Sequence, residues 1–108
     1  MPHAEIKYSN DLELDIPAIL AEIEQVILSH DDGAGDCKGR GYPTDVYHHT
    51  HVAVKVSALV KPHRDAAFSN MLLQSLKAAI TARIPVACAF SIELDYFGPF
   101  YTTGQHQP

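Results

Sequence analysis

The chain begins Met1-Pro2-His3, and Pro2 has the most unusual chemistry available to it. Met1 is normally removed ahead of a small second residue in cytosolic proteins, which would leave Pro2 with a free secondary amine. An α-amino group has a pKa near ~8, and an apolar environment or a nearby cation lowers that pKa. Such an amine could act as a general base near neutral pH. The alternative is that Pro2 is only a permissible first residue of a strand.

A second candidate for chemistry is the sequence YHHTH at residues 47–51. On a strand, His49 and His51 would point to the same side, and a third ligand such as Cys37 or His48 would complete a zinc site. Two histidines at i and i+2 supply only half of such a site, and no acid or water activator accompanies them. The alternative, which is favoured, is an edge or interface strand rich in polar rings.

Composition limits the kinds of protein this chain can be. Its 108 residues are 46% hydrophobic, which predicts one globular domain over residues 1–108. The net charge of -5 and the lack of a basic run argue against a nucleic-acid partner. No apolar stretch approaches the length of a membrane span, and the N-terminus does not resemble a secretory signal, so a cytoplasmic protein is expected. Cys37 and Cys88 have no CxxC spacing and are expected to be free thiols.

Alternation of apolar and polar residues predicts three strands. They cover residues 2–8, 51–59 and 85–94, and an aromatic tail follows the last of them. The segment 31–43 carries four glycines and has no periodicity, so it is predicted to be a long loop.

Two amphipathic helices are predicted between these strands. Asp15 is the expected N-cap of the first helix, which has Pro17 in its first turn and ends near His30. Asp65 is the expected N-cap of the second helix, which stops before Pro85. The strands keep a small or polar second face, so the helices cover one face only and the fold class is α+β or a compact ββα-type sandwich. The uncovered face needs a partner.

The MPH start, the CKGR segment ahead of HVAVKVSAL, the HRD that opens the second helix and the closing AFSIELDYF together resemble the tautomerase superfamily. Within it they are most similar to the 5-carboxymethyl-2-hydroxymuconate isomerase family, over nearly the whole chain. The resemblance implies two β-α-β units, with a mixed sheet covered by two helices on one face, and a homotrimer with pockets near subunit boundaries. It also implies an isomerase that needs no cofactor or metal. Its substrate would be a small unsaturated 2-hydroxy or 2-oxo carboxylic acid.

The resemblance also implies roles for individual residues. Pro2 would be the catalytic acid/base, and Arg64, beside the N-terminus of the second helix, would bind a substrate carboxylate. Alternatively, Arg64 pairs with Asp65 or Asp95 on the surface, which contributes little.

Arg40 would be a second carboxylate ligand, with Lys38 as a weaker candidate because an ammonium binds as a point charge rather than a planar fork. Alternatively, both side chains are solvated among the acidic residues of their loop. A different class of function also remains, namely a non-catalytic trimer or a histidine-based metal-binding module on the same fold.

Overall fold

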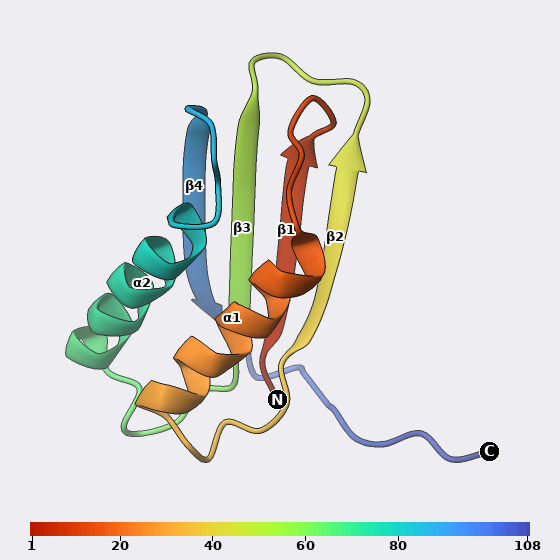
Figure 1. Cartoon of the computed structure of the whole chain (residues 1–108). Coiled ribbons are helices and arrows are strands. Elements are labelled where there is room, and N and C mark those ends of the chain that lie inside the picture. Colours follow the sequence, from red (N-terminus) through yellow and green to blue (C-terminus); the bar gives the residue numbers. More distant parts are fainter.

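The computed structural model describes residues 1–108 as a four-stranded sheet in the order β2-β1-β3-β4 with two helices on one face (Figure 1). In chain order the elements are β1 (His3–Ser9), α1 (Ile16–His30), β2 (Lys38–Thr44), β3 (His51–Ala58), α2 (Ala66–Thr81) and β4 (Ala89–Tyr96). The β1–β2 and β3–β4 pairs are parallel, whereas the central β1–β3 pair is antiparallel. The chain therefore forms two β-α-β units in an α+β fold, as predicted.

Both helices begin where the sequence predicts. The Asp15 side chain accepts a hydrogen bond from the Ala18 N–H (3.1 Å), and the Asp65 side chain accepts one from the Phe68 N–H (2.9 Å). Each bond satisfies one of the N–H groups that a helix leaves unpaired in its first turn. Neither helix has the length and apolar content that a membrane span requires.

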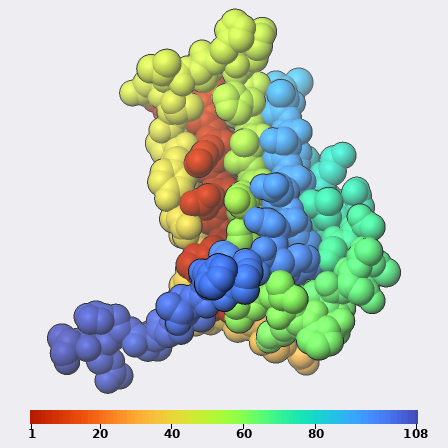
Figure 2. Space-filling view, turned by 180° about the vertical axis from the view of Figure 1, so that it is seen from behind, coloured from red at the N-terminus to blue at the C-terminus, as the bar shows by residue number.

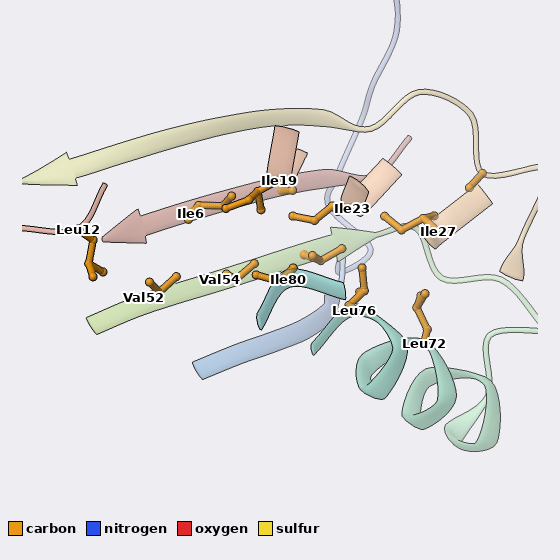
Figure 3. Packing of buried hydrophobic residues seen from close by; sticks show 13 residues of the cluster. Ile6, Leu12, Ile19, Ile23, Ile27, Val52, Val54, Leu72, Leu76 and Ile80 are labelled. Carbon is orange, nitrogen blue, oxygen red and sulfur yellow. The ribbon is translucent and has the colours of Figure 1, made fainter. Parts of the chain in front are cut away.

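The hydrophobic core lies between the sheet and the helices (Figure 3). Alternate residues of β1 and β3 point into it, as do residues one helical turn apart on α1 and α2. The main contributors are Ile6, Val52, Val54, Val56, Ile19, Ile23, Ile27, Leu72, Leu76 and Ile80. Burial of these side chains supplies the main stabilising free energy of the fold.

The other face of the sheet carries no helix and is seen from behind in Figure 2. Four charged residues lie in one row across it, because Glu5 is in register with Arg40 and Lys55, and Lys55 with Glu93. Charges alternate in sign along the row: Arg40 and Glu5 are 3.0 Å apart, and Lys55 and Glu93 are 4.0 Å apart. The predicted polar, uncovered face is therefore present.

The prediction of one long loop over residues 31–43 was wrong, because β2 begins at Lys38. Gly39 and Gly41 face α1, and a Cβ atom at either position would lie 2.7 Å from a carbon of Leu20 or Ile16. The helix thus packs against bare backbone at alternate positions of β2. Glycines occupy the inward-facing positions of β2, where apolar residues would normally give the alternating pattern of a strand. The sequence therefore lacks the apolar–polar alternation that predicts one.

The start of β4 and the conformation of His49 also differ from the sequence prediction. β4 begins at Ala89 rather than at residue 85, because Ala89 pairs with the first residue of β3, His51, and the residues before it have no strand to pair with. His49 lies before β3 and has φ of 65°, so it does not share a strand face with His51.

We expect Gly41→Ala to destabilise the protein by about 1 kcal/mol, because the added methyl group collides with the stiff, β-branched side chain of Ile16. Gly104→Ala is the matched control, since no atom lies within 4 Å of the added Cβ. Urea unfolding of the two variants measures the difference. Equal stability would show that α1 shifts away from β2 at negligible cost.

Candidate active site

Pro2 lies in a pocket at one end of the sheet. Because β1 runs antiparallel to β3, with His3 opposite Ser57, the start of β1 meets the ends of β3 and β4 there. The Pro2 side chain is fully buried. The apolar wall of the pocket is formed by Ile27, Val56, Ala58, Phe68, Leu72 and Leu94. The cavity is narrow, about 10 Å³, which is close to the space that one water molecule needs.

Three polar side chains complete the wall, namely Asp31, Arg64 and Tyr96. Asp31 Oδ2 accepts hydrogen bonds from Arg64 Nε (3.0 Å) and Nη2 (2.8 Å), while Arg64 Nη1 donates to the Leu59 carbonyl (2.7 Å). The side chains of Asp31 and Arg64 are only 9% and 5% exposed. Arg64 therefore forms a buried ion pair with Asp31 rather than a surface pair with Asp65 or Asp95.

The ion pair joins the two β-α-β units. Asp31 follows the last residue of α1, and its N–H donates to the Ile27 carbonyl (2.8 Å), whereas Arg64 precedes the N-cap of α2. A carboxylate at a helix C-terminus is disfavoured by the helix dipole, so Asp31 depends on a cation. Burial opposes ionisation of Asp31, but hydrogen bonds from His63 and Arg64 and the charge of Arg64 outweigh it and lower its pKa.

The terminal amine lies at the same end of the molecule, and its surroundings lower its pKa. The pKa of the Met1 amino group falls below its usual value, first because of burial and then because of the positive charges of Arg64 and Lys61. Both effects penalise the protonated form. The pocket therefore favours a neutral amine near Pro2.

The structure brings Pro2 and Arg64 together, but it does not bring Arg40 or Lys38 to them within one chain. Glycines occupy the β2 positions that face the helix, so Lys38 and Arg40 project from the other face of the sheet. Arg40 donates to Glu5 (3.0 Å) and to the Tyr42 hydroxyl (3.0 Å). The Lys38 side chain lies 3.7 Å from that of Asp36.

The C-terminal segment passes the N-terminus on this outer side. The rings of Phe97 and Tyr101 stack with centroids 3.8 Å apart, and Phe97 meets the edge of His3. The Thr103 hydroxyl lies 3.6 Å from the Met1 sulfur. Burial, followed by the charge of Arg40, lowers the pKa of His3. A neutral His3 ring then accepts a hydrogen bond from Arg40 Nη1 (3.2 Å).

Sequence reasoning missed Asp31 and Tyr96 as pocket residues. Asp31 falls at the start of the predicted loop 31–43, and a carboxylate just after a helix is disfavoured by the helix dipole unless a cation lies close to it. Tyr96 closes β4, and its hydroxyl lies 2.5 Å from Ser69 Oγ on α2. Nothing in the sequence indicates the contact between Tyr96 and Ser69.

The histidine segment does not form a metal site in this structure. No group of three or more His, Cys, Asp or Glu side chains lies close enough to hold an ion. His51 Nδ1 contacts the His49 carbonyl instead (2.8 Å). Both cysteines are free thiols, as predicted. Burial, followed by the charge of Glu24, raises the pKa of Cys37 to about 11, so its thiol stays protonated near neutral pH.

No protein-family model matches the sequence, and no curated protein matches it. The fold is nevertheless similar to several solved structures. A 5-carboxymethyl-2-hydroxymuconate isomerase from Deinococcus radiodurans R1 is 21% identical, with a TM-score of 0.75 over 98% of this chain and 90% of that one. A 5-carboxymethyl-2-hydroxymuconate delta-isomerase is 16% identical, with a TM-score of 0.74 over 98% and 89%.

A fused 4-OT symmetric trimer is 11% identical, with a TM-score of 0.70 over 95% of this chain and 93% of that one. All three have the fold of the tautomerase superfamily. The resemblance that the sequence motifs predict is therefore confirmed for the fold.

We expect Asp31→Ala to lower the free energy of unfolding by about 3 kcal/mol at pH 7, because it leaves the buried Arg64 charge without a partner. Asp36→Ala, which removes only an exposed partner of Lys38, should change it by less than about 0.5 kcal/mol. The folded-state pKa of Asp31 is lowered, so its contribution is present above the ordinary carboxyl pKa and is lost as pH falls through the folded value. Denaturant unfolding at several pH values should therefore show the Asp31→Ala deficit shrinking in acid. A deficit independent of pH would contradict the ion-pair explanation.

Proposed function

We propose that this protein is a cofactor-independent isomerase that moves a proton within an unsaturated 2-hydroxy or 2-oxo carboxylic acid. Its acid/base would be the secondary amine of Pro2, which is free once Met1 is removed. The observation that carries the proposal is the position of Pro2 in an apolar pocket that also contains Arg64. The isomerases among the solved structures of similar fold support the same class of reaction.

The proposed reaction needs one base and one carboxylate ligand. The neutral Pro2 amine takes the proton of the enol hydroxyl, and the electron pair of that O–H bond forms the carbonyl. The electrons of the carbon–carbon double bond then take the same proton from the ammonium at carbon, which returns the amine to its neutral state. Arg64 would bind the substrate carboxylate by donating N–H hydrogen bonds to its oxygen atoms. No atom or electron is gained or lost by the protein.

The surroundings of the terminal amine suit this role. A general base works best when its pKa lies near the working pH, because it must be both unprotonated and able to accept a proton. Burial and the charges of Arg64 and Lys61 lower the amine pKa at the chain terminus, here at Met1. The amine of Pro2 lies closer to the buried pocket and would experience the same effects.

We also propose that the chain assembles as a homotrimer in the cytoplasm. The uncovered sheet face is polar, and the side chain of Phe100, which follows β4, is fully exposed. The C-terminal end of the chain extends from the body (Figure 2). An exposed aromatic ring is common at protein interfaces. The 4-OT trimer of similar fold is consistent with this assembly. In such an assembly, Arg40 would reach only the pocket of another copy, because it projects away from the pocket of its own chain.

The central test compares protein with a free Pro2 amine and protein that retains Met1 or carries an N-terminal tag. The blocked protein should lose enol-to-keto conversion, because an amide nitrogen has no basic lone pair, while its circular dichroism stays unchanged. In the free form the rate should rise with pH through one ionisation below the usual amine pKa of about 8.

Pro2→Ala is the matched variant, since it keeps a primary amine and should keep part of the activity. A blocked protein that is as active as the free one would exclude the amine mechanism. Mass spectrometry of the intact chain verifies the state of the N-terminus.

Assembly is tested separately by light scattering. A chain of 11.9 kDa that forms a trimer should scatter as a particle of about three times that mass at micromolar concentration. Removing the exposed ring with Phe100→Ser should weaken the assembly if the C-terminal segment contacts a neighbouring copy. A wild-type protein with the mass of one chain would contradict the trimer.

A further inference from the structure

The peptide bond between Met1 and Pro2 must break before Pro2 has a free amine, and the fold restricts access to this bond. Pro2 is fully buried, and Met1 is partly covered. The Pro2 carbonyl accepts a hydrogen bond from the Lys38 N–H (2.9 Å). On the outer side, the Thr103 hydroxyl lies 3.6 Å from the Met1 sulfur. Both residues that flank the bond are therefore held by contacts within the chain.

The strand that follows the bond is held on both sides. β1 lies between β2 and β3 (Figure 1), and its first residue, His3, is in register with Lys38 and with Ser57. Ala4 and Ile6 of β1 have no exposed surface. Removing β1 from the sheet would break the hydrogen bonds to both neighbours and expose core residues, so this opening approaches global unfolding. The N-terminus is therefore tied down, unlike the mobile end of most chains.

An aminopeptidase that removes methionine has to enclose Met1 and bring a water molecule to its carbonyl carbon. The C–N bond to Pro2 breaks, the water supplies a hydroxyl group to that carbon and a proton to the nitrogen, and free methionine leaves. In the folded chain, the nitrogen side of this bond belongs to the buried Pro2 ring. Neighbouring copies in a trimer would add cover, so assembly would strengthen this protection rather than remove it.

We propose that Met1 is removed only before β1 enters the sheet, so that the terminal amine of Pro2 is formed while the chain is being synthesised. Both partners of β1 come later in the sequence, and β3 ends at Ala58. At about 5–20 residues per second, synthesis leaves the peptidase roughly 2–10 seconds before both pairings can form. A chain that folds first keeps Met1 for as long as β1 stays paired. The protection of the bond stands without the proposed function, whereas the inactivity of the uncleaved chain rests on it.

The test is cleavage of protein that has folded with Met1 in place. Such protein is made in a cell-free extract whose methionine aminopeptidase is inhibited, and active peptidase is added after purification. Mass spectrometry of the intact chain measures the loss of Met1. A synthetic peptide of residues 1–8, MPHAEIKY, gives the cleavage rate of the same bond without the fold. The folded protein should be cleaved at least about a hundredfold more slowly than the peptide, because only the opened population is a substrate.

Ile6→Val tests whether the opening of β1 limits cleavage. It removes one buried methylene group from β1, and the larger opened population should raise the cleavage rate about threefold to tenfold. Val46→Ala is the matched control, since Val46 is 90% exposed between β2 and β3 and its truncation should leave the rate unchanged. Peptidase that is present during synthesis should remove Met1 from the wild-type chain.

Cleavage of the folded protein at the rate of the peptide would overturn the proposal, and so would equal cleavage rates for Ile6→Val and wild type. Enol-to-keto conversion is measured on the same samples, so the two ideas fail separately. Protection of the bond in a protein that stays inactive after cleavage during synthesis would contradict the proposed function alone. Rapid cleavage of the folded protein, followed by a gain of activity, would contradict the protection alone.

Discussion

The antiparallel pairing of β1 with β3 at the centre of the sheet is the constraint on which the rest of the structure depends. It joins two parallel β-α-β units and places the first residues of the chain beside the last residues of β3. Without it the N-terminus would lie at an edge, in water. With it, Pro2 is fully buried, although a chain end is usually solvated and mobile.

The second interaction that shapes the site is the contact between Asp31 and Arg64. These residues are 33 positions apart, and they meet because α1 ends and α2 begins at the same end of the sheet. The pair links the two units in the wall of the pocket and supplies the only charged side chains of that wall. One interaction thus has a structural role and an electrostatic one.

The helices and their Asp15 and Asp65 caps could be predicted from the sequence, because capping and helical periodicity are local properties. The strand Lys38–Thr44 could not, since glycines occupy its inward positions and the reason for them, close packing of α1, is a tertiary contact. The residues of the candidate site likewise include some that the sequence predicts and some that it does not. Pro2 and Arg64 are identified by resemblance to a family, whereas the partner of Arg64 depends on how the two helices meet.

The two β-α-β units are alike in outline, and the sheet therefore has two ends that correspond to each other. At the end opposite Pro2, the chain enters β3 through Thr50, whose hydroxyl donates to Asp11, and the N–H of His51 donates to the buried hydroxyl of Ser9 (3.0 Å). That end contains an ordinary internal peptide with its hydrogen bonds satisfied. A polypeptide has a single starting residue, so a fold with twofold internal symmetry can display a terminal amine at just one of its two equivalent places. The start of the chain therefore distinguishes two ends of the sheet that are otherwise alike in backbone outline.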